Sequence, residues 1–345
     1  GLSRTLQAPL SEVLRNNLLG INLGRIYPEL EGYKPSDLLP TTPLRKITAR
    51  HTVGLGDPLR DGDIDQPLND GLPHSLEASI QAYGLDHFKI KLCGNLDRDQ
   101  ARLVEIYSVF KQAASGPFFL TLDGNEQYQD IEAFRLHWDQ LRQVPEINSL
   151  LEALLFVEQP LHRDHALDAG VKQALADWPE APPLIIDESE AEIGSLSQAL
   201  ELGYSGTSHK NCKGIVKGIA NACLLEFLKK KFPDRSYILS GEDLANVGPI
   251  ALLQDLAVMS LLGITHVERN GHHYFRGLSM LPEDLRTTVL DHHRDLYRKH
   301  EDGFPTLRIT DGKLAISSVI EAPFGFEGEI DAGRFVSLED WDGII

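Results

Sequence analysis

The sequence is poor in cysteine and has no long apolar run, and each shortage excludes a class of protein. The three cysteines, Cys93, Cys212 and Cys223, are an odd number without zinc-type spacing, which predicts a reducing, intracellular setting. No apolar stretch approaches the length of a transmembrane helix, and the N-terminus lacks the basic-then-apolar layout of a signal peptide. We therefore expect a cytoplasmic protein with no membrane partner.

Positive charge is also scarce, because 33 Lys and Arg residues face 51 Asp and Glu residues, for a formal net charge of −18. Phosphate repulsion would oppose binding to nucleic acid or to an anionic membrane. The acidic excess alone does not indicate a cation site, since acidic surfaces commonly serve solubility. With 345 residues, 42% of them hydrophobic, the chain can bury the core of one large domain plus a smaller one.

Eight short apolar segments recur along the chain and predict strands. They cover residues 47–53, 87–92, 117–123, 154–158, 184–187, 206–210, 236–241 and 264–268. The segments between them have helical patterns, notably 99–114, 131–143, 193–202, 215–231 and 249–262. This α/β repeat predicts a barrel of eight strands. A doubly wound open sheet is the alternative, but the Gly54-Leu55-Gly56-Asp57 stretch lacks its third glycine and is followed by Pro58.

The two ends of the chain have a different character from this repeat. Residues 1–45 are rich in turns and prolines and do not form a complete domain pattern, whereas residues 46–300 carry the barrel. Residues 282–300 are predicted to form a charged helix, and 307–316 a hairpin that turns at Asp311-Gly312. We expect residues 301–345 to form a C-terminal lobe beside the barrel.

Carboxylates end three consecutive predicted strands. Glu158 precedes Pro160, which cannot donate to a strand ladder, and the neighbouring strands end in Asp123 and in Asp187-Glu188. Barrel enzymes build their sites at this end of the strands, and hard oxygen ligands suit Mg²⁺. Capping of the following helices is the alternative use of an Asp. Three carboxylates in a row favour a divalent-metal site.

Lysines end two further strands. Lys89 and Lys91 share one face of the second strand, because side chains alternate with period two. The sixth strand ends in Lys210, across the barrel from Lys91, with Lys213 three residues later. Two lysines with pKa values lowered by nearby cations suit acid and base work on both faces of a carbon next to a carboxylate. The spacing leaves open whether Lys210 or Lys213 points inward.

In this order the motifs resemble the enolase superfamily and, within it, the muconate-lactonizing-enzyme-like subgroup of the mandelate racemase/muconate lactonizing enzyme family. The matching segments are Lys89-Ile90-Lys91, Asp123-Gly124-Asn125-Glu126-Gln127-Tyr128, Glu158-Gln159-Pro160, Asp187-Glu188-Ser189 and Lys210-Asn211-Cys212-Lys213. The resemblance implies a modified TIM barrel, (β/α)7β, with a smaller α+β capping domain. Residues 1–45 would be a remnant of that domain, and 301–345 would pack with it. The mandelate-racemase-like subgroup expects a histidine at the end of the seventh strand, where this chain has Glu242-Asp243.

The resemblance also implies roles for the site residues. Mg²⁺ would be held by Asp123, Glu158 and Asp187, with Glu188 as the alternative third ligand. Lys91 and Lys210 would be the acid and base catalysts. Lys89 would contact the substrate carboxylate, and Asn125 would support the metal ligands without binding the metal itself. Glu242, Asp243 and Glu268 are candidates for substrate contact, with structural pairing as the alternative.

The predicted function is Mg²⁺-dependent removal of the proton α to the carboxylate of a small-molecule substrate, through an enediolate. Racemisation or epimerisation, elimination and cycloisomerisation all follow this start, so the enzyme would be an isomerase or a lyase. We expect a homo-oligomer. A Schiff-base lysine at Lys91 or Lys210, as in barrel aldolases, is one alternative. A non-catalytic homologue is the other, since the N-terminal segment is short for a complete capping domain.

Overall fold

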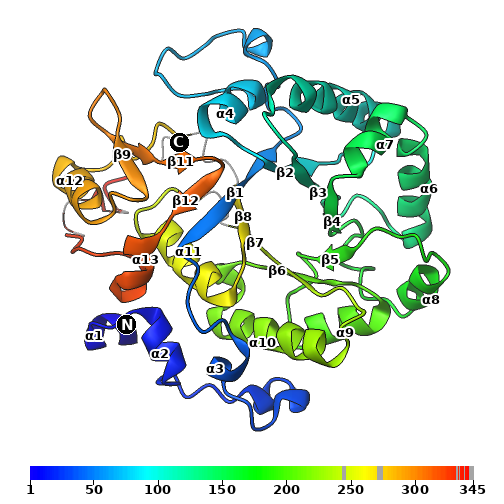
Figure 1. Ribbon diagram of the computed structural model, residues 1–345, viewed down its shortest axis with the longest axis horizontal. Coiled ribbons are helices and arrows are strands. Elements are labelled where there is room, and N and C mark those ends of the chain that lie inside the picture. The colour runs from blue at the N-terminus through cyan, green and yellow to red at the C-terminus, as the bar shows by residue number, and fades with distance from the viewer. Residues whose placement is uncertain (243–245, 270–274, 332, 334, 338, 342–345) are drawn as a thin grey trace.

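Eight parallel strands form a closed ring at the centre of the computed structural model, which describes residues 1–242, 246–269, 275–331, 333, 335–337 and 339–341 (Figure 1). The strands are β1 (Lys46–Val53), β2 (His87–Lys91), β3 (Phe119–Asp123), β4 (Leu154–Glu158), β5 (Leu184–Ile186), β6 (Gly206–His209), β7 (Ile238–Gly241) and β8 (His266–Arg269). Consecutive strands pair from β1 to β7, and β8 pairs with β1. A bridge between Glu242 and Glu268 closes the ring. The predicted barrel and its eight strands are confirmed.

Helices surround the ring and connect its strands (Figure 1). They are α4 (Leu76–Tyr83), α5 (Leu96–Ala113), α6 (Ile131–Leu141), α7 (Pro145–Leu151), α8 (Gly170–Ala176), α9 (Ser195–Leu202), α10 (Ile215–Lys231) and α11 (Ile250–Leu262). Ser75, Asn95 and Asp130 cap α4, α5 and α6 by accepting a backbone N–H bond of the first turn. Among the described residues, no helix combines the length and the apolarity that crossing a membrane requires.

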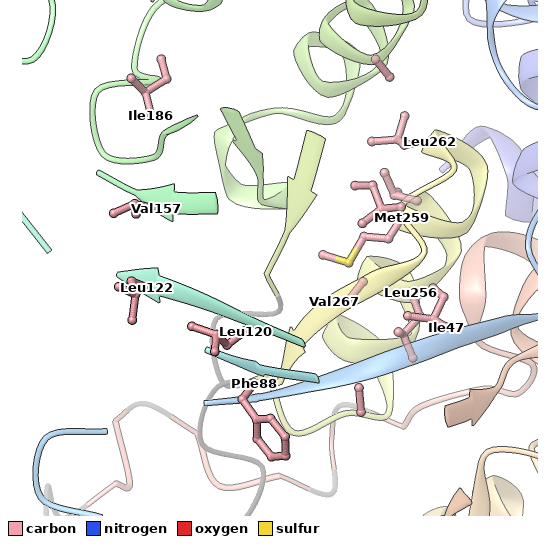
Figure 2. Packing of buried hydrophobic residues seen from close by; sticks show 14 of the residues in the cluster. Ile47, Phe88, Leu120, Leu122, Val157, Ile186, Leu256, Met259, Leu262 and Val267 are labelled. Atoms are coloured by element: carbon pink, nitrogen blue, oxygen red, sulfur yellow. The ribbon is translucent and has the colours of Figure 1, made fainter. Parts of the chain in front are cut away.

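The hydrophobic core lies between the strands and this helix layer. Figure 2 shows the buried side chains Leu120, Leu122, Val157 and Ile186 from β3, β4 and β5. Thr121 and Asp123 alternate with the first two, so they point into the ring instead. Burial of each such apolar side chain contributes about 1.5–3 kcal/mol. The strands therefore turn these apolar side chains toward the helices. Polar side chains occupy much of the interior of the ring, where Phe156 of β4 packs beside Arg50 and His266.

The first 45 residues run along the outside of the barrel, below α10 in Figure 1. They contain α1 (Leu2–Leu6), α2 (Leu10–Arg15), α3 (Pro35–Leu38) and the 3-10 turns η1 (Leu23–Arg25) and η2 (Pro28–Leu30), with no strand. Two further 3-10 turns, η3 (Asp61–Asp63) and η4 (Asn211–Lys213), follow β1 and β6. The helix α3 and the turn η2 contact α10, so the N-terminal segment packs against the barrel's helix layer.

The described C-terminal part contains two helices, four short strands and a 3-10 turn. Its elements are α12 (Glu283–His292), β9 (Tyr297–Lys299), β10 (Pro305–Leu307), β11 (Ile309–Thr310), β12 (Lys313–Ala315), α13 (Ser317–Glu321) and η6 (Pro323–Gly325). The predicted hairpin is confirmed, because Asp311 and Gly312 both have positive φ, as a two-residue turn requires. The predicted helix over 282–300 is too long, since 297–299 pairs with β10 instead. The strand β12 pairs with β1. The division into segments 1–45, 46–300 and 301–345 stays a prediction.

Candidate active site

The predicted site residues gather at one end of the ring. Asp123 and Glu158 are the last residues of β3 and β4, and Asp187 and Lys210 directly follow β5 and β6. The strands are parallel, so their carboxyl ends meet at the same edge. Lys89 and Lys91 reach this edge from β2, and Glu242 and Glu268 reach it from β7 and β8.

Lys89 is buried at the centre of four carboxylates. Its Nζ lies 2.5 Å from Glu268 Oε2 and 2.9 Å from Asp123 Oδ2. Glu158 Oε2 is 3.1 Å away and Glu242 Oε2 is 3.9 Å away. Burial opposes the charged ammonium, but the four carboxylates outweigh burial and raise the pKa of Lys89 well above its usual value. Lys89 is therefore a fixed cation.

One ammonium does not balance four carboxylates. Burial raises the pKa of Glu158 to about 8, and the charges of Asp187 and Asp123 add to the rise while Lys89 opposes it. Within the part of the chain that the structure describes, neither Glu158 oxygen takes part in a hydrogen bond, although Oε2 forms the ion pair with Lys89. Burial likewise raises the pKa of Glu268 to about 7, against the opposing charge of Lys89. These carboxyl groups lack compensating positive charge.

Asp187 has the opposite surroundings. Lys213 Nζ lies 2.6 Å from its Oδ1, Lys210 Nζ lies 2.8 Å from its Oδ2, and the Ser208 hydroxyl donates to Oδ1. Burial would raise the pKa of Asp187, but the Lys213 and Lys210 ammonium groups outweigh it and hold that pKa well below its usual range. The sequence left open which of the two lysines points inward, and both reach the same carboxylate.

The two lysines expected to move protons differ in their surroundings. Lys210 Nζ also lies 2.7 Å from Glu242 Oε2, and its side chain is 12% exposed. Lys91 is 27% exposed, and its Nζ is 3.9 Å from Asp123 Oδ2. The strands β2 and β6 are four places apart in the ring, so the lysines approach from opposite sides. Asp187 and Glu242 overcome burial and raise the pKa of Lys210 in this structure. The expected lowering, which depends on nearby cations, stays a prediction.

Three carboxylates can share one cation. Among the residues that the structure describes, Glu158, Glu242 and Glu268 place ligand oxygens within 4.8 Å of one another. Only Glu158 belongs to the set predicted from sequence, whereas Asp123 and Asp187 lie beside the group in contact with lysines. The oxygen donors and the free acceptor capacity of Glu158 fit a hard divalent ion such as Mg²⁺. Sequence reasoning gave Glu242 and Glu268 either substrate contact or structural pairing, and in the structure both lie near the Lys89 ammonium group.

The remaining predicted residues hold the edge of the site. Asn125 has a positive φ and donates its backbone N–H to Asp123 Oδ1 at 2.9 Å, so it orients that carboxylate. Glu188 follows Asp187 along the chain, and burial followed by the charge of Asp187 raises the pKa of Glu188 to about 7. Asp243 lies outside the described residues.

Gln159 joins the ends of β4 and β5, a role that sequence reasoning missed. Its Oε1 accepts the backbone N–H groups of Asp187 at 2.7 Å and Ser189 at 3.2 Å. Its Nε2 donates to Ser189 Oγ at 2.7 Å and to the carbonyl of Leu161 at 2.8 Å. All four bonding positions of a buried amide are filled, so Gln159 fixes the spacing between Glu158 and Asp187.

Comparisons with known proteins agree with this architecture. No family model matches the sequence, and the search of curated proteins gives no match. Among solved structures, the dipeptide epimerase of Enterococcus faecalis V583 is 15% identical, with 95% of this chain and 71% of that chain covered and a TM-score of 0.55. Its complex with Mg and the dipeptide L-Leu-L-Tyr is 16% identical, with 79% of this chain and 60% of that chain covered and a TM-score of 0.50.

Two further structures extend this likeness. The dipeptide epimerase of Methylococcus capsulatus complexed with Mg ion is 17% identical over 94% of this chain and 69% of that one, with a TM-score of 0.51. A mandelate racemase/muconate lactonizing family protein of Azoarcus sp. EbN1 is 16% identical, with 95% of this chain and 72% of that chain covered and a TM-score of 0.49. At these identities the likeness shows the fold alone, and the matches with TM-scores of 0.50 to 0.55 agree with the predicted barrel over most of the chain.

Proposed function

We propose that this protein is a Mg²⁺-dependent enzyme that removes the proton α to the carboxylate of a small-molecule substrate and forms an enediolate. The observation that supports the proposal is the meeting, at the carboxyl ends of the strands, of a buried carboxylate group with lysines from opposite sides of the ring. The structurally similar dipeptide epimerases, two of them solved with Mg, support the same reaction class.

Glu158, Glu242 and Glu268 would hold the ion together with the adjacent predicted ligands Asp123 and Asp187. Bound there, the ion would supply positive charge beside the substrate carboxylate and so make the neighbouring C–H bond more acidic. Lys89 stays protonated, so it neutralises and orients the substrate carboxylate rather than acting as a base.

Lys91 and Lys210 then take the proton roles on the two faces of the α-carbon. Lys91 is the more exposed lysine and has one distant carboxylate partner, so its Nζ is free to approach substrate. Lys210 accepts a proton once positive charge offsets Asp187 and Glu242, since these carboxylates are what raise its pKa. A lysine on each face suits racemisation or epimerisation, which needs both, and it also permits elimination and cycloisomerisation.

The structure opposes the Schiff-base alternative at Lys210. A Schiff-base lysine attacks as a neutral amine, whereas without bound metal two carboxylates within 2.8 Å stabilise the ammonium form of Lys210 and raise its pKa. Borohydride reduction in EDTA, in the presence of carbonyl substrates, should therefore leave no covalent adduct on this lysine.

The test is hydrogen–deuterium exchange at the α-carbon in D₂O, followed by NMR, across dipeptides, N-acyl amino acids and acid sugars. Exchange should require Mg²⁺ and stop in EDTA. Lys91→Ala and Lys210→Ala should each lower it by roughly 10²–10⁴-fold. Lys46→Ala, at the exposed far end of β1, is the control and should exchange like wild type. Exchange that survives EDTA, or that survives loss of both lysines, would refute the proposal.

A further inference from the structure

Three buried polar side chains from distant parts of the chain meet outside the ring. Tyr27 belongs to the N-terminal segment, Asn221 lies on α10, and Glu190 lies in the loop between β5 and α9. The Tyr27 hydroxyl lies 2.5 Å from Asn221 Oδ1 and 3.1 Å from the carbonyl oxygen of Ile193. Asn221 Nδ2 in turn donates to Glu190 Oε1 at 2.9 Å. The N-terminal segment is thereby connected to the loop after β5.

Lys217 on α10 completes this connection. Its Nζ lies 3.0 Å from Glu190 Oε2 and donates to the carbonyl oxygens of Glu190 at 2.9 Å and Ala191 at 3.3 Å. The loop is thus held through one side chain and through backbone carbonyls at residues 190, 191 and 193. Hydrogen bonds to charged groups are stronger than those between neutral groups, so Lys217 holds the loop firmly.

The same loop begins with Asp187 and Glu188. The backbone N–H of Glu190 donates to the carbonyl of Asp187 at 3.0 Å, which forms a tight turn between the site and the buried network. On the inner side, Gln159 binds the backbone of Asp187 and Ser189. Gln159 therefore holds the loop from within the barrel. The Tyr27 network, which consists of Tyr27, Asn221, Glu190 and Lys217, holds it from outside.

We infer that Tyr27, Asn221 and Glu190 are positioning residues, through which the N-terminal segment orients the loop that carries Asp187 and Glu188 toward the metal and substrate. This inference rests on the proposed function. Apolar side chains of similar size would pack as stably at buried positions, and a buried polar network in which every member is paired supplies a defined geometry instead. The network ends at Glu190, three residues after Asp187, so it fixes the position of the backbone that carries the Asp187 side chain.

The test compares two tyrosines whose hydroxyl groups are buried. Tyr27→Phe removes the contacts to Asn221 and to the carbonyl of Ile193, and Tyr204→Phe removes a 2.9 Å bond to the carbonyl of Ala166. We expect Tyr27→Phe to weaken Mg²⁺ binding about 10–100-fold by calorimetry, as loss of a group supporting a metal ligand does. It should also speed amide exchange in peptides covering residues 187–194. Tyr204→Phe should lower the melting temperature similarly and change neither readout.

A more conservative variant tests whether the effect of Tyr27→Phe comes from misfolding. Glu190→Gln keeps an acceptor for Asn221 but loses the charge opposite Lys217, so its Mg²⁺ affinity should fall between those of wild type and Tyr27→Phe. Equal Mg²⁺ affinities and equal loop exchange in the two tyrosine variants would overturn the inference. Failure of the proposed function has a different signature, since wild type itself would then not bind Mg²⁺, and the contrast in loop exchange would still decide whether Tyr27 positions the loop.

Discussion

The two buried ion clusters at the strand ends are opposite in charge. Around Lys89, one ammonium group faces four carboxylates. Around Asp187, one carboxylate lies between the ammonium groups of Lys210 and Lys213. The consequence is visible in the pKa values, since burial raises that of Glu158 to about 8 and the two lysines lower that of Asp187. The Lys89 cluster is short of positive charge, and the Asp187 cluster is not.

This difference shows that the Lys89 cluster is the one that needs a further cation, and one carboxylate links the two clusters. Glu242 belongs to both, because its Oε2 lies 2.7 Å from Lys210 Nζ and 3.9 Å from Lys89 Nζ. Burial opposes its charge, yet Lys89 and Lys210 together lower the pKa of Glu242. Positive charge added beside Lys89 would compete with Lys210 for this carboxylate. A metal at the acidic cluster would therefore weaken the hold of Glu242 on Lys210, the lysine that we propose transfers a proton.

Removal of the central cation should have the largest effect. Lys89→Met leaves four buried carboxylates without their shared ammonium, and breaking a buried ion pair costs about 3–5 kcal/mol. We expect a loss of that size in the free energy of unfolding by urea at pH 7.5 in EDTA. Lys91→Met is the matched control, since its 27% exposed side chain lies 3.9 Å from one carboxylate and should contribute at most about 1 kcal/mol. Equal losses would show that Lys89 does not stabilise the cluster.

The acidic cluster should also make stability fall with rising pH when metal is chelated. Glu158, with a pKa of about 8 in the folded protein, holds its proton where the unfolded chain has lost it. Stability should drop on the order of 2 kcal/mol between pH 6.5 and 8.5, from the size of this shift. Buried His209, whose pKa burial lowers to about 4, titrates below this window.

Added Mg²⁺ should reverse that trend, because metal binds the deprotonated carboxylates and its affinity rises with pH. At a concentration of 100 times its dissociation constant, it adds about 2.7 kcal/mol of stability. Urea unfolding at both pH values, in EDTA and in Mg²⁺, measures the two effects. Stability that rises with pH in EDTA would contradict the picture of an acidic cluster lacking positive charge.

The fold was predictable because its signal is local. A parallel strand buried by helices is a largely apolar run, and at β3 and β4 such runs end in Asp123 and Glu158. The sequence thus indicates both the strands and the edge at which their ends meet. The hairpin at Asp311-Gly312 was equally predictable from the sequence, since its turn needs residues that accept positive φ.

The contacts across the ring could not be predicted, because they depend on how far each strand extends. Glu242 and Glu268 face Lys89 from β7 and β8, far along the chain, and no spacing in the sequence sets that distance. The same applies to Lys210, whose pKa depends on carboxylates from two other strands. Tyr27 carries no local sign of its contact with α10. Sequence therefore named residues at the edge, and the structure assigned their partners.

The smallest expected effect concerns a single hydroxyl within the acidic cluster. Thr52 Oγ1 donates to Glu268 Oε1 at 2.9 Å, and this bond stabilises the ionised carboxylate most. Thr52→Val should therefore cost about 1 kcal/mol of unfolding free energy at pH 8.5 and less at pH 5.5, where Glu268, with a pKa of about 7, is protonated. Thr121→Val on β3 is the control, because the buried Thr121 hydroxyl has no hydrogen-bond partner among the described residues and its loss should be neutral or stabilising. A cost at Thr52 that does not change with pH would separate this hydroxyl from the charge of Glu268.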